Sequence, residues 1–207
     1  MNVGQIDGYW SLPGWCDFEN IYREMVRRAP ENGCSRFVEI GTAFGRSAAM
    51  MGDLIRQSGK RVEFWTCDTF DEANLHQDIA NHLAAERKRC GSVSFEGLAM
   101  AMIRAAGVHE YVIPCKRASV DFAKGFEDAS LDFVFIDGDH SYDQVLADMR
   151  AWLPKVKDGG WLGGHDVGIP EVRQALADSG GLPFVVDNTS WLVWVKRFNR
   201  QADYTSL

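Results

Sequence analysis

Short apolar runs that alternate with helical segments are the feature that most constrains the fold of this 207-residue chain. Seven runs are candidate strands: SRFVEI (35–40), RVEFWTC (61–67), EYVIPC (110–115), LDFVFI (131–136), GWLGGH (160–165), LPFVV (182–186) and SWLVWVKR (190–197). Strands that alternate with helices are typical of α/β folds, because a parallel pair needs a crossover of a dozen or more residues. The pattern therefore predicts a mostly parallel sheet.

The last two runs are separated only by Asp187, Asn188 and Thr189. A link this short closes an antiparallel hairpin, so we expect the last strand to run against the others. The spacing of apolar residues predicts four helices, over 17–28, 47–57, 75–89 and 141–153. These elements together predict a sheet covered by helices.

The length of the chain is typical of one domain, and we expect residues 1–207 to form a single unit. Residues 1–30 would be an N-terminal arm and its helix. Residues 70–95 fit no slot in the alternation and are expected to be an insertion with a helix of its own. Arm and insertion together would form a lid over a site on the domain.

Composition excludes several classes of function. A net charge of −7 opposes nonspecific binding to nucleic acid or to an anionic membrane. No apolar stretch reaches the roughly 18 to 20 residues that span a bilayer, and the first ten residues lack the plan of a secretory signal. The five cysteines form no C-x-x-C pair, which disfavours zinc or thioredoxin-like chemistry. A reducing, cytoplasmic location is the simplest expectation.

Polar and acidic residues follow the predicted strands. They are Glu39 to Ser47, then Asp68, Ser119, the trio Asp137, Asp139 and His140, and finally His165 and Asp166. The carboxyl ends of parallel strands meet at one edge of the sheet, where ligands of open α/β sheets bind. The sequence therefore predicts a binding site at that edge.

The loop after the first strand indicates the kind of ligand. It reads Gly41-Thr42-Ala43-Phe44-Gly45, which is neither G-x-G-x-x-G nor a P-loop. Glu39, two residues before Gly41, would repel a pyrophosphate, whereas Asp68 could hold the hydroxyls of a ribose. A cofactor with a ribose and a cationic group but no phosphate fits this pattern. S-adenosylmethionine is such a molecule.

Two segments carry a family resemblance. VEIGTAFGRSA (38–48) resembles motif I of the class I S-adenosylmethionine-dependent methyltransferases. FIDGDHSYDQVLADMRAWLPKVKDGGWLGGHD (135–166) is similar to a block of their family 24, which itself resembles catechol-type and macrolide-sugar O-methyltransferases. The resemblance covers about residues 13–197. It implies a Rossmann-like three-layer sandwich with a seven-stranded, mostly parallel sheet whose last strand is antiparallel.

The resemblance also implies roles for individual residues. Those that would bind the cofactor are Glu39, Gly41, Thr42, Gly45 and Ser47 at its methionine end, Asp68 and Thr69 at the ribose, Ser119 near the adenine, and Asp137 and Gly138 at the methyl-transfer site. The acceptor hydroxyl would enter near Asp137 and Asp166. His140 would be the general base, because a histidine that titrates near neutrality suits that role.

Some relatives bind a divalent metal at the positions of Asp137, His165 and Asp166. His165 departs from their pattern, because Mg2+ is a hard cation that prefers oxygen ligands. The sequence leaves open whether the site binds Mg2+, a softer divalent cation or no metal at all.

Other interpretations of these residues also stay open. Asp139 could cap the helix that follows Ser141, and His140 could be a hydrogen-bonded structural histidine. Asp166 could stabilise a turn. The aromatic residues Tyr9, Trp10, Trp15 and Phe18 could line an acceptor pocket or fasten the arm to the domain.

We expect an S-adenosylmethionine-dependent methyltransferase that acts on an oxygen of a small acceptor, such as a sugar, a phenol or a natural product. One alternative is a glycosyltransferase that uses Asp137-Gly138-Asp139 as a D-x-D metal site. Another is a non-catalytic protein that binds S-adenosylmethionine. Trp191 and Trp194 are candidates for a homodimer surface.

Overall fold

A single seven-stranded sheet forms the centre of the computed structural model, which describes residues 8–73, 75–180 and 183–196. The strands are β1 (Ser35–Ile40), β2 (Val62–Asp68), β3 (Ile113–Lys116), β4 (Leu131–Ile136), β5 (Val156–Gly164), β6 (Val185–Asp187) and β7 (Ser190–Trp194), in the order β3-β2-β1-β4-β5-β7-β6. The first five strands are parallel, whereas β7 is antiparallel to both β5 and β6. The predicted hairpin is confirmed.

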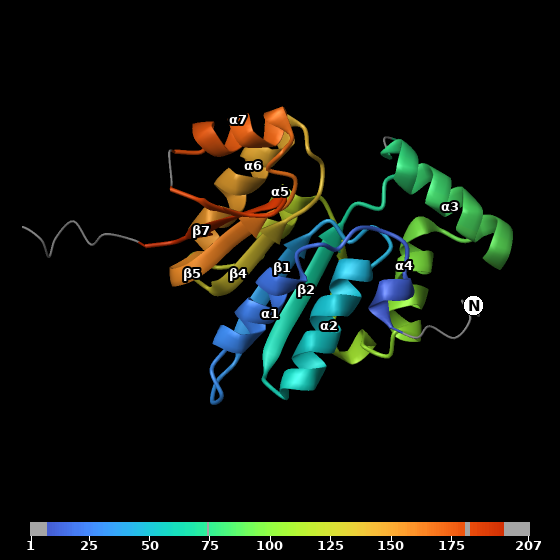
Figure 1. The fold of residues 1–207 in the computed structure, drawn as a ribbon, viewed down its shortest axis with the longest axis horizontal. Helices are drawn as coiled ribbons and strands as arrows, with labels where there is room; N and C mark the ends of the chain where they lie inside the picture. The colour runs from blue at the N-terminus through green and yellow to red at the C-terminus, as the bar shows by residue number, and fades with distance from the viewer. Residues whose placement is uncertain (1–7, 74, 181–182, 197–207) are drawn as a thin grey trace, which may run out of the picture.

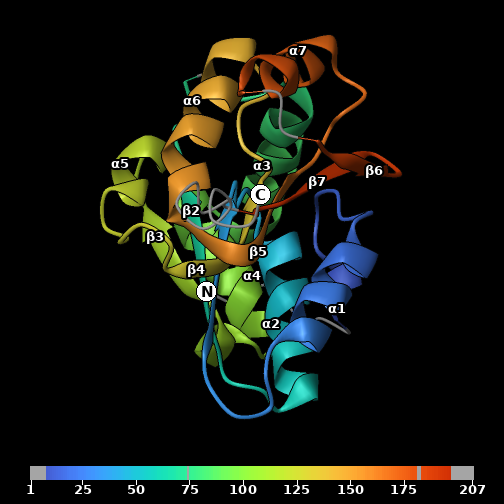
Figure 2. The same ribbon diagram turned by 90° about the vertical axis from the view of Figure 1, so that its left-hand side faces the viewer.

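Helices cover both faces of the sheet and produce the predicted three layers (Figures 1 and 2). One face carries α1 (Glu19–Arg28), α2 (Arg46–Ser58) and α4 (Phe95–Ala105), and the other carries α5 (Ser119–Ala123), α6 (Tyr142–Trp152) and α7 (Pro170–Asp178). Short 3-10 helices span Tyr9–Ser11, His109–Tyr111 and Leu153–Lys155. The fold is the Rossmann-like α/β sandwich.

Alternate residues of β4 divide the core into two parts. Phe133 and Phe135 pack on the side of α1 and α2, whereas Val134 and Ile136 pack on the side of α6. All four are 4% exposed or less. Each such side chain contributes roughly 1.5–3 kcal/mol by leaving water. Burial on both faces explains why this strand has an uninterrupted apolar sequence.

Several boundaries differ from the sequence prediction. Strand β3 begins at Ile113 because His109–Tyr111 form a 3-10 turn. Strand β5 begins at Val156, earlier than predicted. The pairing of β5 with the last strand continues beyond β7, because Gly159 N donates to Val195 O (2.8 Å). Strand β6 is only three residues long. Residues 182 and 197, which we placed in the last two strands, lie outside the described residues.

Three helices were not predicted: the five-residue α5, and the longer α4 and α7. Helix α4 begins after Ser94, whose hydroxyl accepts a hydrogen bond from Gly97 N (3.0 Å). Helix α7 begins with Pro170, whose fixed φ suits the first helical position. Both start signals are short and local, which explains why the apolar spacing alone did not reveal them.

The segment 70–95 contains the expected helix, α3 (Gln77–Cys90), which stands at one end of the molecule (Figure 1). Leu83 is buried, but most of the helix faces solvent. Arg87 ties the helix to the preceding loop through two 2.8 Å hydrogen bonds to Glu72. The function of this segment as a lid stays a prediction.

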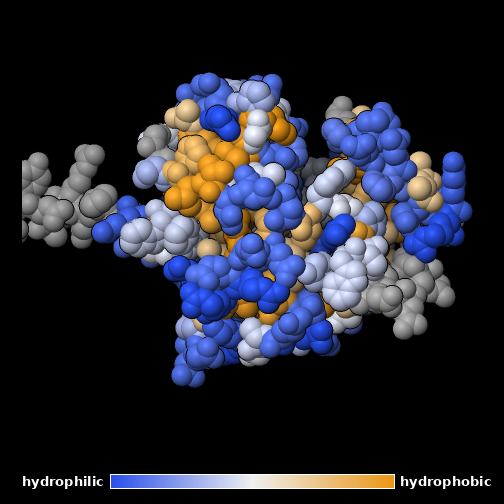
Figure 3. All heavy atoms as spheres, viewed as in Figure 1, coloured by the Kyte–Doolittle hydropathy of each residue, from blue (hydrophilic) through white to orange (hydrophobic). Residues whose placement is uncertain are grey.

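Hydrophobic side chains gather on the surface over β7 and the neighbouring end of the sheet (Figure 3). The exposed ones in this region include Val185, Val186 and Trp194. Trp191 is fully buried, so our expectation that it contributes to a homodimer surface is wrong: its side chain points into the core beside α7. Among the described residues, no helix has the length and apolar character needed to cross a bilayer.

Candidate functional site

The loop between β1 and α2 lies directly against the end of β4. Gly41 has φ +99°, and a Cβ atom built on it would lie 1.9 Å from the carbonyl oxygen of Asp137. Only glycine fits there. Gly45, with φ +82°, completes the turn into α2. The two loops that carry the family resemblance are therefore in van der Waals contact.

Asp68 organises this loop. Its Oδ2 accepts hydrogen bonds from Thr42 N (3.0 Å) and Ala43 N (2.9 Å), and its Oδ1 accepts one from Phe70 N (2.8 Å). A carboxylate has about four acceptor positions, so one is left. Asp68 can therefore accept one ribose hydroxyl without releasing the loop, and its role in holding both hydroxyls stays a prediction.

Glu39 lies beneath the loop instead of lining the open edge of the sheet. Its side chain is 1% exposed and accepts hydrogen bonds from the hydroxyls of Tyr22 (2.5 Å) and Thr66 (2.9 Å). Burial raises the pKa of Glu39 to about 7, although bonds from Tyr22, Thr66 and Ser47 oppose the rise. Tyr22 and Thr66 are site residues that our sequence reasoning missed.

Other predicted cofactor residues lie at the same edge with varied partners. The buried hydroxyl of Thr42 bonds to that of Thr66 (2.7 Å), so only the backbone of Thr42 faces the loop. Thr69 Oγ1 accepts from Asp71 N (3.2 Å), and Ser119 Oγ accepts from Trp152 Nε1 (2.8 Å). Contact of these residues and of Gly138 with a cofactor stays a prediction.

Two aspartates and two histidines gather beyond β4 and β5, and we call Asp137, His140, His165 and Asp166 the Asp–His cluster. His140 Nε2 lies 3.0 Å from Oδ2 of Asp166 and 3.6 Å from Oδ1 of Asp137. His165 Nδ1 lies 3.1 Å from Oδ2 of Asp166 and 3.5 Å from Oδ1 of Asp137. Each histidine thus lies close to both carboxylates.

These contacts strongly shift the pKa values. The carboxylates of Asp137 and Asp166 raise the pKa of His140 to about 9. Burial opposes charge on His165, but the same two carboxylates outweigh it and raise the pKa of His165 to about 11. The histidines in turn lower the pKa of both aspartates. For Asp137 they do so although burial alone would raise it. The two carboxylates thus stabilise the protonated form of His140, and its role as a general base stays a prediction.

The donor set of the cluster fits a divalent cation of borderline softness. Ligand atoms of Asp137, His140 and Asp166 lie within 4.8 Å of one another, and Nδ1 of His165 lies beside both carboxylates. Two oxygen donors and an imidazole nitrogen suit zinc, cobalt or iron(II) better than Mg2+. The predicted set was Asp137, His165 and Asp166, whereas the group that the structure brings together has His140 in place of His165.

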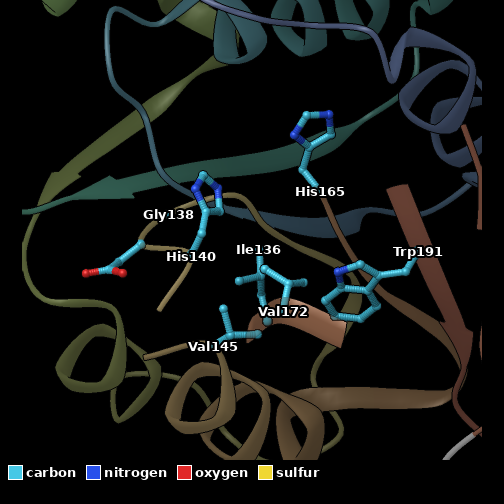
Figure 4. Close-up of a pocket in the computed structure, with 8 residues that line it drawn as sticks. Ile136, Gly138, His140, Val145, His165, Val172 and Trp191 are labelled. Atoms are coloured by element: carbon cyan, nitrogen blue, oxygen red, sulfur yellow. The ribbon is translucent and has the colours of Figure 1, made fainter. Parts of the chain in front are cut away.

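A small cavity lies below the cluster (Figure 4). His140 and His165 line one side of it, and Val145, Val172 and Trp191 line the other. The buried indole nitrogen of Trp191 has no hydrogen-bond partner among the described residues. In Figure 4 the rings of His140 and His165 point away from these three apolar side chains.

Asp139 does not belong to the cluster. Its Oδ1 accepts a hydrogen bond from Ser141 N (2.7 Å), which forms a turn directly before α6. Ser141 is the N-cap of α6 and no side chain caps the helix, so the capping interpretation of Asp139 is wrong. Because Asp139 bonds the turn before α6 and Asp137 faces the histidines, the two carboxylates of the D-x-D motif do not converge. The arrangement disfavours the glycosyltransferase alternative.

The N-terminal arm reaches the cluster, which no sequence signal predicted. Asp17 Oδ1 lies 2.7 Å from His165 Nε2, across 148 positions of sequence. Asp17 also accepts hydrogen bonds from Asn188 and Thr189 in the β6–β7 turn. Phe18 is buried against the His165 ring and so fastens the arm, as one interpretation of the aromatic residues proposed.

Exposed aromatic residues remain on the arm. Trp10 and Trp15 are 60% and 55% exposed, and the ring of Trp15 meets that of His82 on α3 edge to face. Arg46 donates to Gly14 O (2.7 Å) and holds this part of the arm over the start of α2. The arm and α3, the two segments expected to form a lid, are therefore in contact.

Comparisons with known proteins agree with this geometry. A family profile described as a methyltransferase domain, that of family 24, matches residues 38–167. The O-methyltransferase NovP has a similar structure, with a TM-score of 0.60 and 18% identity over 86% of this chain and 79% of NovP. A SAM-dependent O-methyltransferase from Thermotoga maritima has a TM-score of 0.58 and 15% identity, over 96% of this chain and 69% of the other. The TDP-rhamnose 3'-O-methyltransferase CalS11 has a TM-score of 0.54 and 13% identity, over 85% of this chain and 76% of CalS11. At these identities the structural likenesses show a shared fold.

Proposed function

Because this chain belongs to the methyltransferase-domain family, we propose that it transfers the methyl group of S-adenosylmethionine to an oxygen atom of a small-molecule acceptor. The observation that carries the proposal is the contact between two loops: the glycine loop that begins at Gly41 touches the backbone of Asp137, which begins the Asp–His cluster. The expected cofactor site and the expected acceptor site are therefore adjacent.

The glycine loop and the residues behind it are suited to the cofactor. Asp68 has one free acceptor position for a ribose hydroxyl. Gly41 and Gly45 let the backbone approach the ligand closely, and the loop offers no phosphate cradle. Glu39 adds negative potential beneath the expected position of the cationic methionine end. These features favour a sulfonium nucleoside over a dinucleotide.

The Asp–His cluster is suited to the acceptor. We assign Asp137 and Asp166 to binding the acceptor hydroxyl, with His140 as the group that takes its proton. Asp137 and Asp166 raise the pKa of His140 to about 9, so this assignment requires the ring to lose its proton before it can act as the base. Most of the remaining acceleration would come from alignment of the two reactants.

The donor set supports a divalent cation as an alternative to a histidine base. If Asp137, His140 and Asp166 held the cation, it would lower the pKa of the acceptor hydroxyl, and His140 would then be a ligand and not the base. The imidazole donor favours zinc, cobalt or iron(II) over Mg2+.

A small acceptor is supported by the fold neighbours and by the lid. CalS11 is described as a TDP-rhamnose methyltransferase, which places a sugar hydroxyl among the acceptor classes to test. The arm and α3 meet at Trp15 and His82, which is consistent with the predicted lid. A lid of this kind would select small molecules by shape.

The test is calorimetric titration with S-adenosylhomocysteine of the wild type, Asp68→Ala and the matched control Asp71→Ala. Asp71 is exposed and belongs to the adjacent loop. We expect micromolar binding that Asp68→Ala weakens at least tenfold and Asp71→Ala leaves within twofold. Absence of binding by the wild type contradicts the cofactor assignment.

A methyl-transfer assay with sugar and phenol acceptors then separates an enzyme from a binding protein. Turnover of any acceptor supports the proposal. Tight cofactor binding without turnover, across both acceptor classes and with each divalent cation, supports the non-catalytic alternative instead.

A further inference from the structure

The N-terminal arm and the β6–β7 turn meet at one histidine of the Asp–His cluster. Oδ1 of Asp17 lies 2.7 Å from Nε2 of His165, and the hydroxyl of Thr189 lies 2.8 Å from the same nitrogen. Asp17 Oδ2 accepts from Thr189 Oγ1 (2.9 Å) and from Asn188 Nδ2 (3.1 Å). Asp17 therefore joins three segments of the chain that are distant in sequence.

The arrangement fixes the orientation of the imidazole ring. Nε2 of His165 faces Asp17, so Nδ1 faces Asp137 and Asp166, 3.5 and 3.1 Å away. The ring of Phe18 packs on His165 with the centroids 5.1 Å apart. His165 is only 9% exposed, so it has little room to rotate once Asp17 holds it.

We propose that Asp17 is a positioning residue, which orients His165 so that Nδ1 of this ring faces the acceptor site. A carboxylate that binds one ring nitrogen of a histidine fixes the direction in which the other nitrogen points. Asp17 does this from the N-terminal arm. The effect of Asp17 on catalysis rests on the proposed function, whereas its effect on the orientation of the His165 ring does not.

The direct test of orientation is nitrogen NMR of 15N-histidine-labelled protein, which needs no turnover. We expect the wild type to show a hydrogen-bonded Nε2–H of His165, assigned with a His165→Asn sample. Asp17→Ala should lose this signal, and Asp17→Asn, which keeps an acceptor oxygen, should retain it at a shifted position. An unchanged His165 signal in Asp17→Ala overturns the proposal.

The kinetic test separates positioning from a merely structural role. Asp17→Ala should lower kcat by 10- to 100-fold, as losses of such supporting carboxylates do, with the Kd for S-adenosylhomocysteine within twofold of the wild type. Asp17→Asn should recover part of the loss. A parallel loss of cofactor binding and turnover shows that Asp17 only supports the fold, and overturns the proposal.

The matched control is Asn188→Gly, which removes one contact of Asp17 and leaves His165 untouched. Glycine keeps the positive φ of +54° that Asn188 adopts. We expect the control to retain kcat and the His165 signal within twofold. If the wild type turns over no acceptor, the proposed function fails, and the NMR comparison alone decides whether Asp17 orients His165. If Asp17→Ala does not fold, Asp17→Asn with an unshifted His165 signal overturns the proposal.

Discussion

The hydroxyl of Tyr22 donates a 2.5 Å hydrogen bond to Oε2 of Glu39 in the interior of the protein. Tyr22 belongs to α1 and is fully buried, whereas Glu39 belongs to β1 directly before the glycine loop. The first helix therefore supports the floor of the expected cofactor site. A buried carboxyl group needs such partners, because desolvation without a hydrogen bond is costly.

Tyr22→Phe should destabilise the protein by about 1–3 kcal/mol, because it leaves one oxygen of Glu39 without its donor. The loss should be larger at pH 8 than at pH 5, because Glu39, with a pKa near 7, is ionised only at the higher pH. Urea unfolding at both pH values measures this. Tyr142→Phe, which removes an exposed hydroxyl bonded to Asp178, is the control and should cost below about 0.5 kcal/mol. Equal losses for the two variants would contradict the role of Tyr22.

Gly41→Ala should destabilise the fold by roughly 3 kcal/mol or more, because its Cβ would collide with the backbone of Asp137 and the residue has a positive φ. Gly138→Ala is the matched control on the facing loop. Its added Cβ would lie 3.5 Å from Ile40, an ordinary contact, and we expect below about 1 kcal/mol. Thermal unfolding of both variants measures the difference, and a stable Gly41→Ala protein would show that the loop can move apart.

Asp148 should make the stability depend on pH. It is 1% exposed, and burial raises its pKa to about 6 despite bonds from Ser119 and Gln144. The folded state therefore holds a proton that the unfolded state releases near pH 4, so stability falls as pH rises from about 4 to 6. The fall attributable to this group is roughly 3 kcal/mol.

Asp148→Asn removes that titration. Its stability relative to the wild type should rise between pH 4 and pH 7, because the amide stays neutral and can still bond Gln144. Urea unfolding at several pH values measures this difference. A constant difference between the two proteins over that range would show that Asp148 titrates normally.

The metal preference of the Asp–His cluster should follow its nitrogen donors. Calorimetry with each chloride salt should show Zn2+ or Co2+ binding at least tenfold more tightly than Mg2+. Asp166→Asn should weaken this binding strongly, because it removes one of the two carboxylates. Asp139→Asn should leave it unchanged, because the Asp139 carboxylate instead bonds Ser141 N in the turn before α6. Preferential binding of Mg2+ would contradict the assignment of His140 as a ligand.

The sequence by itself determined the order of the strands along the chain, the two helical layers and the antiparallel end of the sheet. These follow from local patterns: apolar runs such as 131–136, the spacing of apolar residues in α6, and the three-residue link before Ser190. It also determined that Asp68, Asp137 and Asp166 lie at one edge, because the carboxyl ends of parallel strands coincide there. The family resemblance could be identified because motif I (38–48) and the 135–166 block are each an unbroken stretch of sequence.

The contacts between these residues depend on the folded chain. Asp17 lies 148 positions from His165 and no periodicity connects them, yet folding brings them within 2.7 Å. The pKa values of His140 and His165 depend on burial and, for each ring, on one carboxylate from the end of the neighbouring strand, which is Asp166 for His140 and Asp137 for His165. Local sequence sets backbone conformation and which face of an element is apolar. Hydrogen bonds and charges act through space, and their partners exist only once the chain has folded.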